Sequence, residues 1–119
     1  MWTYQQGSGI LSAAGGIVVG DGYSGTGAGR NNAAMQDVHN VGPLPEGFYL
    51  ISPAYDHPRL GPITMDLVPD TDNVMYGRDD FRIHGDNGAH DASEGCIVMD
   101  HGVRLRVSAS PDRRLMVVA

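Results

Sequence analysis

The sequence predicts a small, mostly β domain, and three observations support this fold class. The chain has 119 residues, a length that suits one domain, so we place a single domain over residues 1–119. Its 17 glycines and 7 prolines are spread along the chain, which is typical of many turns between short strands. Hydrophobic residues make up 41% of the chain, enough to build a core. We therefore expect a β-sandwich or β-meander with long loops and one short helix.

Residues 2–23 contain short apolar runs separated by glycine-rich turns, a pattern typical of a β-meander. The last run leads into residues 20–25, which fit the G-x-G-x-x-G pattern of dinucleotide-binding proteins. That pattern requires a helix at the third glycine, and the glycine-rich residues 26–32 do not favour one. We expect instead a long surface loop over residues 20–32 that lines a site.

The middle of the chain alternates between stiff turns and strands. Pro43 and Pro45 fix their own φ angles and exclude a helix before the apolar run 48–51, which we predict as a strand. Residues 53–62 are expected to form a loop. Apolar and polar residues alternate over 63–67, which predicts a half-buried strand.

The last third of the chain predicts strand, loop, strand and a closing strand. Residues 81–84 alternate apolar and polar side chains, residues 85–95 are small or polar, and residues 96–99 are apolar again. Residues 100–107 fit either an alternating strand or a short helix capped by its first residue, and we favour the helix. Residues 114–118 follow a proline-containing turn and are predicted to be the closing strand.

Charge and cysteine content exclude several classes of protein. The net charge is −6, with eight scattered arginines and no lysine, so nucleic acid is not an expected partner. No apolar run is long enough to span a membrane. The start of the chain lacks the basic and apolar regions of a signal peptide, so we expect synthesis in the cytoplasm. The single cysteine cannot form an internal disulfide.

The single cysteine, Cys96, is the candidate nucleophile. It follows Gly95, a residue that can adopt a tight backbone conformation and leave N–H groups pointing outward near the sulfur. His84, at the end of the strand 81–84, shares the accessible face of that strand with Arg82 and can lie beside Cys96 if the loop folds back. A neighbouring imidazole can hold a thiolate–imidazolium pair. The alternative is structural, because a free cysteine commonly behaves as a small buried hydrophobe.

Metal binding is a competing hypothesis for the same residues. The spacing of His84, His90, Cys96 and His101 fits no common structural zinc pattern, and there is no C-x-x-C. Asp70 and Asp72 lack the additional ligands of a calcium loop, so we expect a polar turn there. We therefore expect no metal and no cofactor.

Several motifs of the chain resemble a known family. His84-Gly85 followed by Ser93-Glu94-Gly95-Cys96-Ile97 resembles the His-Gly … Ser-His-Gly-Cys motif of the L,D-transpeptidase catalytic (YkuD-like) domain. Residues 42–49 are similar to the Thr-Pro-x-Gly-x-Tyr segment of that family. Over nearly its full length, the chain resembles the compact L,D-transpeptidase-related effectors that the type VI secretion system injects between bacteria.

The resemblance implies an enzyme of known chemistry. A cysteine acyltransferase of this kind acts on peptidoglycan stem peptides, and Cys96 would attack the carbonyl of the third stem residue. His84 would transfer the proton while the backbone carbonyl of Gly85 holds its ring. Backbone N–H groups near Gly95 and Cys96 would bind the oxyanion, and Ser93 would support the loop. The acceptor decides between L,D-carboxypeptidase, cross-linking and exchange activity.

Two departures from the broader motif affect substrate binding. Glu94 replaces the histidine before Gly-Cys, and Val98 replaces an arginine two positions after the cysteine. The candidates for substrate binding are Arg82, Arg78, Asp86 and Tyr23. For the two arginines, a surface salt bridge is the alternative.

The resemblance also implies a place of action and partners. We expect export by a secretion apparatus into the periplasm of a target bacterium, stem peptides as the substrate, and a cognate immunity protein. The alternative function is a non-catalytic peptidoglycan-binding domain, or a structural domain of a phage or secretion particle, in which the motif persists without turnover.

Overall fold

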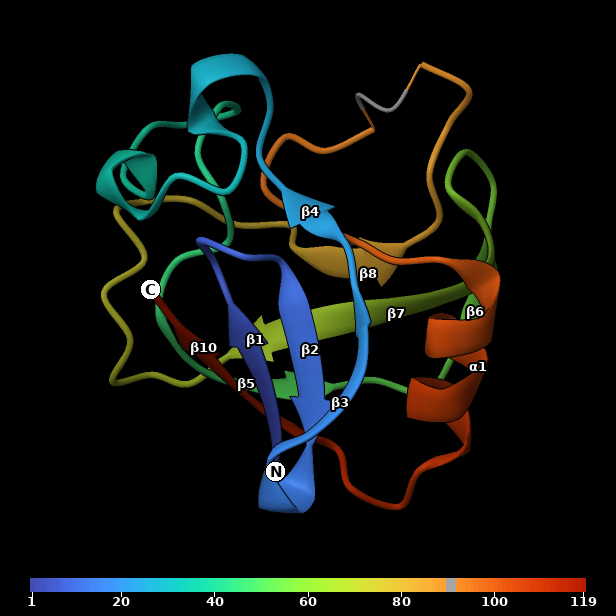
Figure 1. Cartoon of the computed structure of the whole chain (residues 1–119). Coiled ribbons are helices and arrows are strands. Elements are labelled where there is room, and N and C mark those ends of the chain that lie inside the picture. Colours follow the sequence, from blue (N-terminus) through green and yellow to red (C-terminus); the bar gives the residue numbers. More distant parts are fainter. Residues whose placement is uncertain (90–91) are drawn as a thin grey trace.

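The computed structural model describes residues 1–89 and 92–119, and these form a sheet that curls into a nearly closed barrel (Figure 1). The ten strands of this part of the chain are β1 (Trp2–Gln5), β2 (Ile10–Ala13), β3 (Ile17–Asp21), β4 (Tyr23–Ser24), β5 (Gly47–Ile51), β6 (Tyr55–His57), β7 (Gly61–Pro69), β8 (Arg82–His84), β9 (Ile97–Val98) and β10 (Arg114–Val118). Three 3₁₀ helices (Ala14–Gly16, Gly27–Gly29 and Ala33–Met35) and one α-helix, α1 (His101–Ala109), complete the described elements.

The order of the strands explains why the sheet nearly closes. Neighbouring strands run β3-β2-β1-β10-β5-β7-β8-β9-β4, and β6 pairs with β7. The two end strands, β3 and β4, are separated in sequence only by Gly22. A Cβ atom on Gly22 would lie 1.9 Å from the carbonyl oxygen of Val98, so only glycine permits this close approach. The mostly β prediction is confirmed, and the expected β-sandwich takes the form of a barrel-like sheet.

Helix α1 packs against the sheet beside β7. The side chain of Asp100 accepts a hydrogen bond from the Val103 N–H at 2.8 Å and caps the helix, which confirms the predicted helix. Val103 also contacts β3, because a Cβ atom built on Gly20 would lie 2.6 Å from its Cγ2 atom. Arg104 reaches β7, where its Nη1 donates to the Pro62 carbonyl oxygen at 2.7 Å. The helix therefore joins the two sides of the curled sheet.

The core lies between the sheet and α1 and follows the alternation of the strands. Tyr4, Leu115 and Met65 are fully buried, and Leu11 and Ile83 are 1% exposed. Burying each large apolar side chain contributes about 1.5–3 kcal/mol. The core also contains further apolar residues from strands, from loops and from α1: Trp2, Leu44, Tyr49, Ile51, Leu67, Phe81, Ile97, Met99, Val103, Val107 and Val117.

Two predictions about loops need correction. The expected loop 53–62 contains β6, because Tyr55 pairs with Thr64 and His57 with Gly61 across a tight turn. The expected loop 20–32 begins with the end of β3 and with β4, and only its remainder is loop and 3₁₀ helix. β4 pairs with β9, more than 70 residues further along the chain, so the local composition does not reveal this strand. The N-terminal β-meander is confirmed, since β1, β2 and β3 are consecutive antiparallel neighbours.

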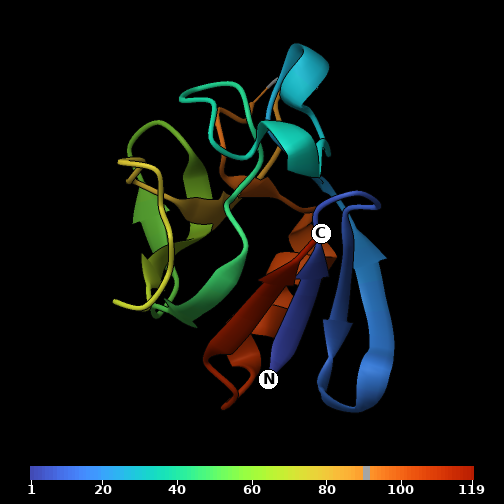
Figure 2. The ribbon, with the colours of Figure 1, turned by 90° about the vertical axis from the view of Figure 1, so that its left-hand side faces the viewer.

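Two long segments cover one end of the barrel, near β4 and β8 (Figure 2). We call them the upper loops and define them as residues 25–46 together with the described residues of 85–96. No helix in the described residues is long and apolar enough to cross a membrane.

Candidate active site

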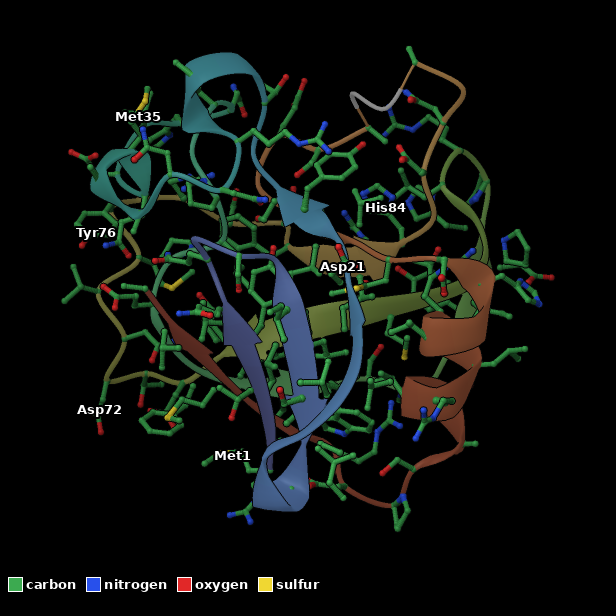
Figure 3. All side chains as sticks on the ribbon, viewed as in Figure 1. Met1, Asp21, Met35, Asp72, Tyr76 and His84 are labelled. Carbon is green, nitrogen blue, oxygen red and sulfur yellow. The ribbon has the colours of Figure 1, made fainter. Side chains whose placement is uncertain are left out.

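Cys96 and His84 line the same cavity, of about 450 Å³, beneath the upper loops. Arg82, Arg59 and Glu94 are among the other residues that line it. Figure 3 shows His84 near β4, below the loops at this end of the sheet. The two residues chosen from the sequence as nucleophile and base therefore face one space.

The pairing of β8 with β9 brings Cys96 to this position. The two strands are parallel, with Ile83 opposite Ile97 and His84 opposite Val98. Cys96 comes one residue before β9, so it lies level with Arg82 and on the same face of the sheet as His84. Adjacent strands are about 4.8 Å apart, which places a thiol and an imidazole within reach of each other.

His84 is held in one tautomer. Its Nδ1 lies 2.7 Å from the carbonyl oxygen of Gly85, and a carbonyl can only accept, so Nδ1 carries the proton and Nε2 is the basic nitrogen. The residue is 1% exposed, whereas the alternation of the strand had placed it on an accessible face. Burial lowers the pKa of His84, the bond to Gly85 partly raises it, and the charges of Arg104 and Arg82 lower it further.

The Cys96 thiol is half-buried, and its surroundings disfavour the thiolate. Its Sγ lies 3.8 Å from the carbonyl oxygen of Asp80, a weak contact in which the thiol donates. Burial raises the pKa of Cys96, and a backbone hydrogen bond from Arg82 and the charge of that residue only partly offset this effect. With the pKa of His84 lowered, a neutral thiol beside a neutral imidazole is favoured. The resting thiolate–imidazolium pair expected from the sequence is thus not the favoured state.

Ser93 supports the nucleophile through its hydroxyl. The fully buried Ser93 Oγ donates to the Cys96 carbonyl oxygen at 2.6 Å and accepts from the N–H groups of Gly25 (2.9 Å) and Gly95 (3.1 Å). The role of loop support that the resemblance implies fits this geometry. Of the Gly95 and Cys96 amides considered as oxyanion donors, the Gly95 N–H already donates to Ser93. The Cys96 N–H is therefore the candidate oxyanion donor.

Gly95 cannot be replaced without moving its neighbours. Its φ angle is +136°, a backbone conformation that favours glycine. A Cβ atom there would lie 2.5 Å from Nη2 of Arg78 and 2.7 Å from Cε1 of Phe81. The tight conformation expected before Cys96 is present.

Ser24 is a supporting residue that the sequence analysis missed. Its fully buried Oγ donates to the Gly95 carbonyl oxygen at 3.0 Å and accepts from the Leu44 N–H at 2.8 Å. These contacts fasten the turn before Cys96 to the other upper loop. A serine in a short glycine-rich stretch carries no signal of such a role, because its partners are 71 and 20 residues away.

Arg78, a candidate for substrate binding, holds backbone carbonyls, and this structural role fits it better. It is 6% exposed, and burial lowers the pKa of its guanidinium. The guanidinium donates to four backbone carbonyl oxygens, those of Gln36 (2.5 Å), Pro43 (2.8 Å), Gly42 (2.9 Å) and Glu94 (3.3 Å). Arg78 therefore joins the two upper loops with four of its five N–H donors.

Arg82 remains a candidate for substrate binding, because it lines the cavity and is partly exposed. Its Nε donates to Oδ1 of Asp66 (3.1 Å) and to the Tyr55 hydroxyl (3.2 Å), and the Tyr55 hydroxyl donates to the same Oδ1 atom at 2.5 Å. The two partners orient the guanidinium.

Tyr23 and Asp86 hold a loop together. The Tyr23 hydroxyl donates to Oδ1 of Asp86 at 2.6 Å and accepts from the Ala92 N–H at 2.9 Å, while the Arg30 guanidinium lies 3.8 Å above the ring. Burial and the bond to Asp86 raise the pKa of Tyr23 to about 12. Neither Tyr23 nor Asp86 is among the described residues that line the cavity, so a loop-fastening role fits them better than substrate binding.

Arg104 is a second residue that the sequence analysis missed. A Cβ atom on Gly85 would lie 2.8 Å from Nη2 of Arg104, so the guanidinium packs directly against the glycine that orients His84. Nothing in the helical sequence around Arg104 indicates this contact.

Metal binding finds no support in the described part of the chain. Within residues 1–89 and 92–119, no group of three His, Cys, Asp or Glu side chains is placed to hold a metal ion. His90, one of the candidate zinc ligands, lies outside the described residues.

Comparison with known proteins identifies the family. A family model described as the Tlde1 domain matches residues 19–117, most of the chain. The chain belongs to the Tlde1 domain family. This is a family of type VI secretion effectors, so the predicted effector class is confirmed, whereas the relation of this Tlde1 domain to L,D-transpeptidases stays a prediction. No curated protein matches the sequence.

Proposed function

We propose that this Tlde1 domain is a cysteine acyltransferase that acts on peptidoglycan stem peptides as an L,D-transpeptidase or L,D-carboxypeptidase. The observation that carries the proposal is the shared cavity of Cys96 and His84, with the His84 Nδ1 proton held by the Gly85 carbonyl. Delivery as a type VI effector into the periplasm of a rival bacterium would bring the domain to this substrate, and the producing cell would need a cognate immunity protein.

The first half of the reaction forms a thioester. His84 Nε2 takes the proton of the Cys96 thiol as Sγ forms a bond to the carbonyl carbon of the third stem residue. The bond between that carbon and the nitrogen of the terminal D-amino acid then breaks. His84 returns the proton to the leaving amine, and the stem remains attached to Cys96 as a thioester.

The second half repeats the steps in reverse order with a new nucleophile. His84 removes a proton from water or from an incoming amine, which attacks the thioester carbonyl. The carbon–sulfur bond then breaks, and His84 returns the proton to Sγ of Cys96. Water gives a tripeptide, another stem gives a cross-link, and a free D-amino acid gives an exchanged stem.

In both halves of the reaction, the Cys96 N–H is the donor that binds the oxyanion. A well-placed donor of this kind contributes about 3 kcal/mol to the transition state. Ser24 donates to the Gly95 carbonyl oxygen and so holds the peptide unit that carries this N–H.

Incubation of the purified domain with tetrapeptide muropeptides tests the proposal. We expect a tripeptide or exchanged product in the mass spectrum, and no product with Cys96→Ala. Arg106→Gln, an exposed substitution on α1, is the matched control and should retain activity. If folded wild type gives no product, and wild type and Cys96→Ala bind sacculi equally well, the non-catalytic alternative is favoured.

A further inference from the structure

The charged side chains of the cavity are divided between two ends. Asp79 and Glu94, with Asn40, also line a small adjoining cavity of about 50 Å³. Arg59 and Arg82 line only the main cavity. Arg78, which holds backbone carbonyls, also lines the small cavity, and Asp80 also lines only the main one. We call the end formed by β8 and the turn between β6 and β7 the basic end, because it carries two arginines and one carboxylate, that of Asp80.

Arg82 offers donors at the basic end. Its Nε is engaged by Asp66 and Tyr55, which leaves the terminal nitrogens to face the cavity. Nη1 has one long bond of 3.4 Å to the Asp80 carbonyl oxygen, and Nη2 lies 4.0 Å from the Asp80 carboxylate. That carboxylate is 82% exposed, so water screens its attraction for the guanidinium.

Arg59 approaches the same end from the turn between β6 and β7. The turn is ordered, because Nδ1 of His57 accepts hydrogen bonds from the backbone N–H groups of Arg59 and Leu60, both at 3.1 Å. The residue is exposed, and its side chain makes no hydrogen bond or ion pair with the described residues. The backbone of Arg59 is thus fixed while its guanidinium is available to a ligand.

We propose that Arg59 and Arg82 form a carboxylate subsite beside Cys96. Guanidinium groups match the planar geometry of a carboxylate, and two of them can share its two oxygens. The identity of the ligand rests on the proposed function. It is the terminal carboxylate of the D-amino acid that leaves, since this group lies one residue beyond the carbonyl that Cys96 attacks. The subsite selects stems that end with a free carboxylate directly after the scissile bond.

Two alkylating agents of nearly equal size test the subsite without any peptidoglycan. Iodoacetate carries a carboxylate and iodoacetamide a neutral amide, and in both reactions the sulfur–carbon bond forms as iodide leaves. The measured quantity is the ratio of the iodoacetate rate to the iodoacetamide rate at Cys96, divided by the same ratio for a free model thiol. We expect a normalised ratio of about three to ten in wild type at low salt, falling toward one as salt is added.

Single substitutions assign the effect to the two arginines. Arg59→Gln should lower the normalised ratio severalfold while the iodoacetamide rate stays near that of wild type. Arg82→Lys keeps the charge and loses the planar fork, so it should lower the ratio by a smaller factor. Arg106→Gln removes the same charge from an exposed position on α1 and should leave the ratio unchanged. A ratio at or below one in wild type, or an equal change in all three variants, would overturn the subsite.

A second comparison uses the proposed reaction. The kcat/KM for tetrapeptide stems with a free terminal carboxylate should fall severalfold in Arg59→Gln, whereas the kcat/KM for the same stems with a terminal amide should not change. If wild type turns over both stems equally, the subsite is wrong and the proposed function stands. If the alkylation ratio behaves as expected and no stem is turned over, the subsite stands and the proposed function is wrong.

Discussion

The barrel core and the upper loops are stabilised in different ways. In the core, fully buried apolar side chains such as Leu115 and Tyr4 pack between the sheet and α1. The upper loops are held by three buried polar side chains, Ser24, Ser93 and Arg78, which form hydrogen bonds to carbonyl and amide groups of the loop backbone. The core therefore determines whether the chain folds, and the polar contacts determine where Cys96 lies relative to His84.

The largest effect on stability is expected from Leu115→Ala in the core. Leu115 is fully buried, so its truncation should lower the free energy of unfolding by about 2–5 kcal/mol. Urea unfolding measures this loss. In conditions where the variant is fully folded, the iodoacetamide rate at Cys96 should match wild type; a changed rate would show that the core also positions the thiol.

Arg78→Met should affect both stability and thiol reactivity. Losing the guanidinium leaves buried carbonyl groups without donors, and we expect a loss of about 3 kcal/mol from several such groups. Release of Glu94 should also change the alkylation rate of Cys96. Arg106→Met is the matched control and should change neither quantity. Unchanged reactivity in Arg78→Met would contradict a role for Arg78 in holding the loop.

Ser93→Ala should have a smaller effect on stability and a clear effect on the site. It removes a buried hydroxyl with three partners, at a cost of about 1–3 kcal/mol. We expect a lower kcat and a changed alkylation rate at Cys96. Ser108→Ala on α1 removes a hydroxyl bonded only to its own helix and serves as the control. Equal behaviour of the two variants would show that Ser93 does not position Cys96.

The sequence predicted the core better than the site. Alternation identified the core-facing side chains of residues 63–67 and 81–84 but placed the buried His84 on an accessible face. Capping chemistry identified the helix after Asp100. Short-range patterns of this kind are readable because the residues that determine them are neighbours in the chain.

Within the site, the sequence predicted the chemical groups and missed most of their supports. Cys96, His84 and the Gly85 contact were anticipated, whereas Ser24, Arg104 and the loop-holding contacts of Arg78 were not. The partners of Ser24 and Arg78 are as many as 71 residues away in the chain, so no local pattern encodes the contacts.

The smallest expected effect concerns pH and tests the neutral resting state of the site. Because burial raises the pKa of Cys96, its iodoacetamide rate should increase only above the ordinary thiol range of roughly pH 8.5–9. Because the pKa of His84 is lowered, the neutral base required for turnover should persist below about pH 6.5. A plateau of rapid alkylation in mildly acidic solution would instead indicate a resting thiolate–imidazolium pair.

The central claim is that Cys96 is the nucleophile, and the mass of the intact protein tests it most directly. Wild type mixed with tetrapeptide stems and quenched rapidly in acid should gain the mass of the stem minus its terminal D-amino acid, with the adduct located on Cys96. Cys96→Ala should gain no mass and release no D-amino acid. Release of the D-amino acid by Cys96→Ala at the wild-type rate would contradict the account, because another group would then perform the attack.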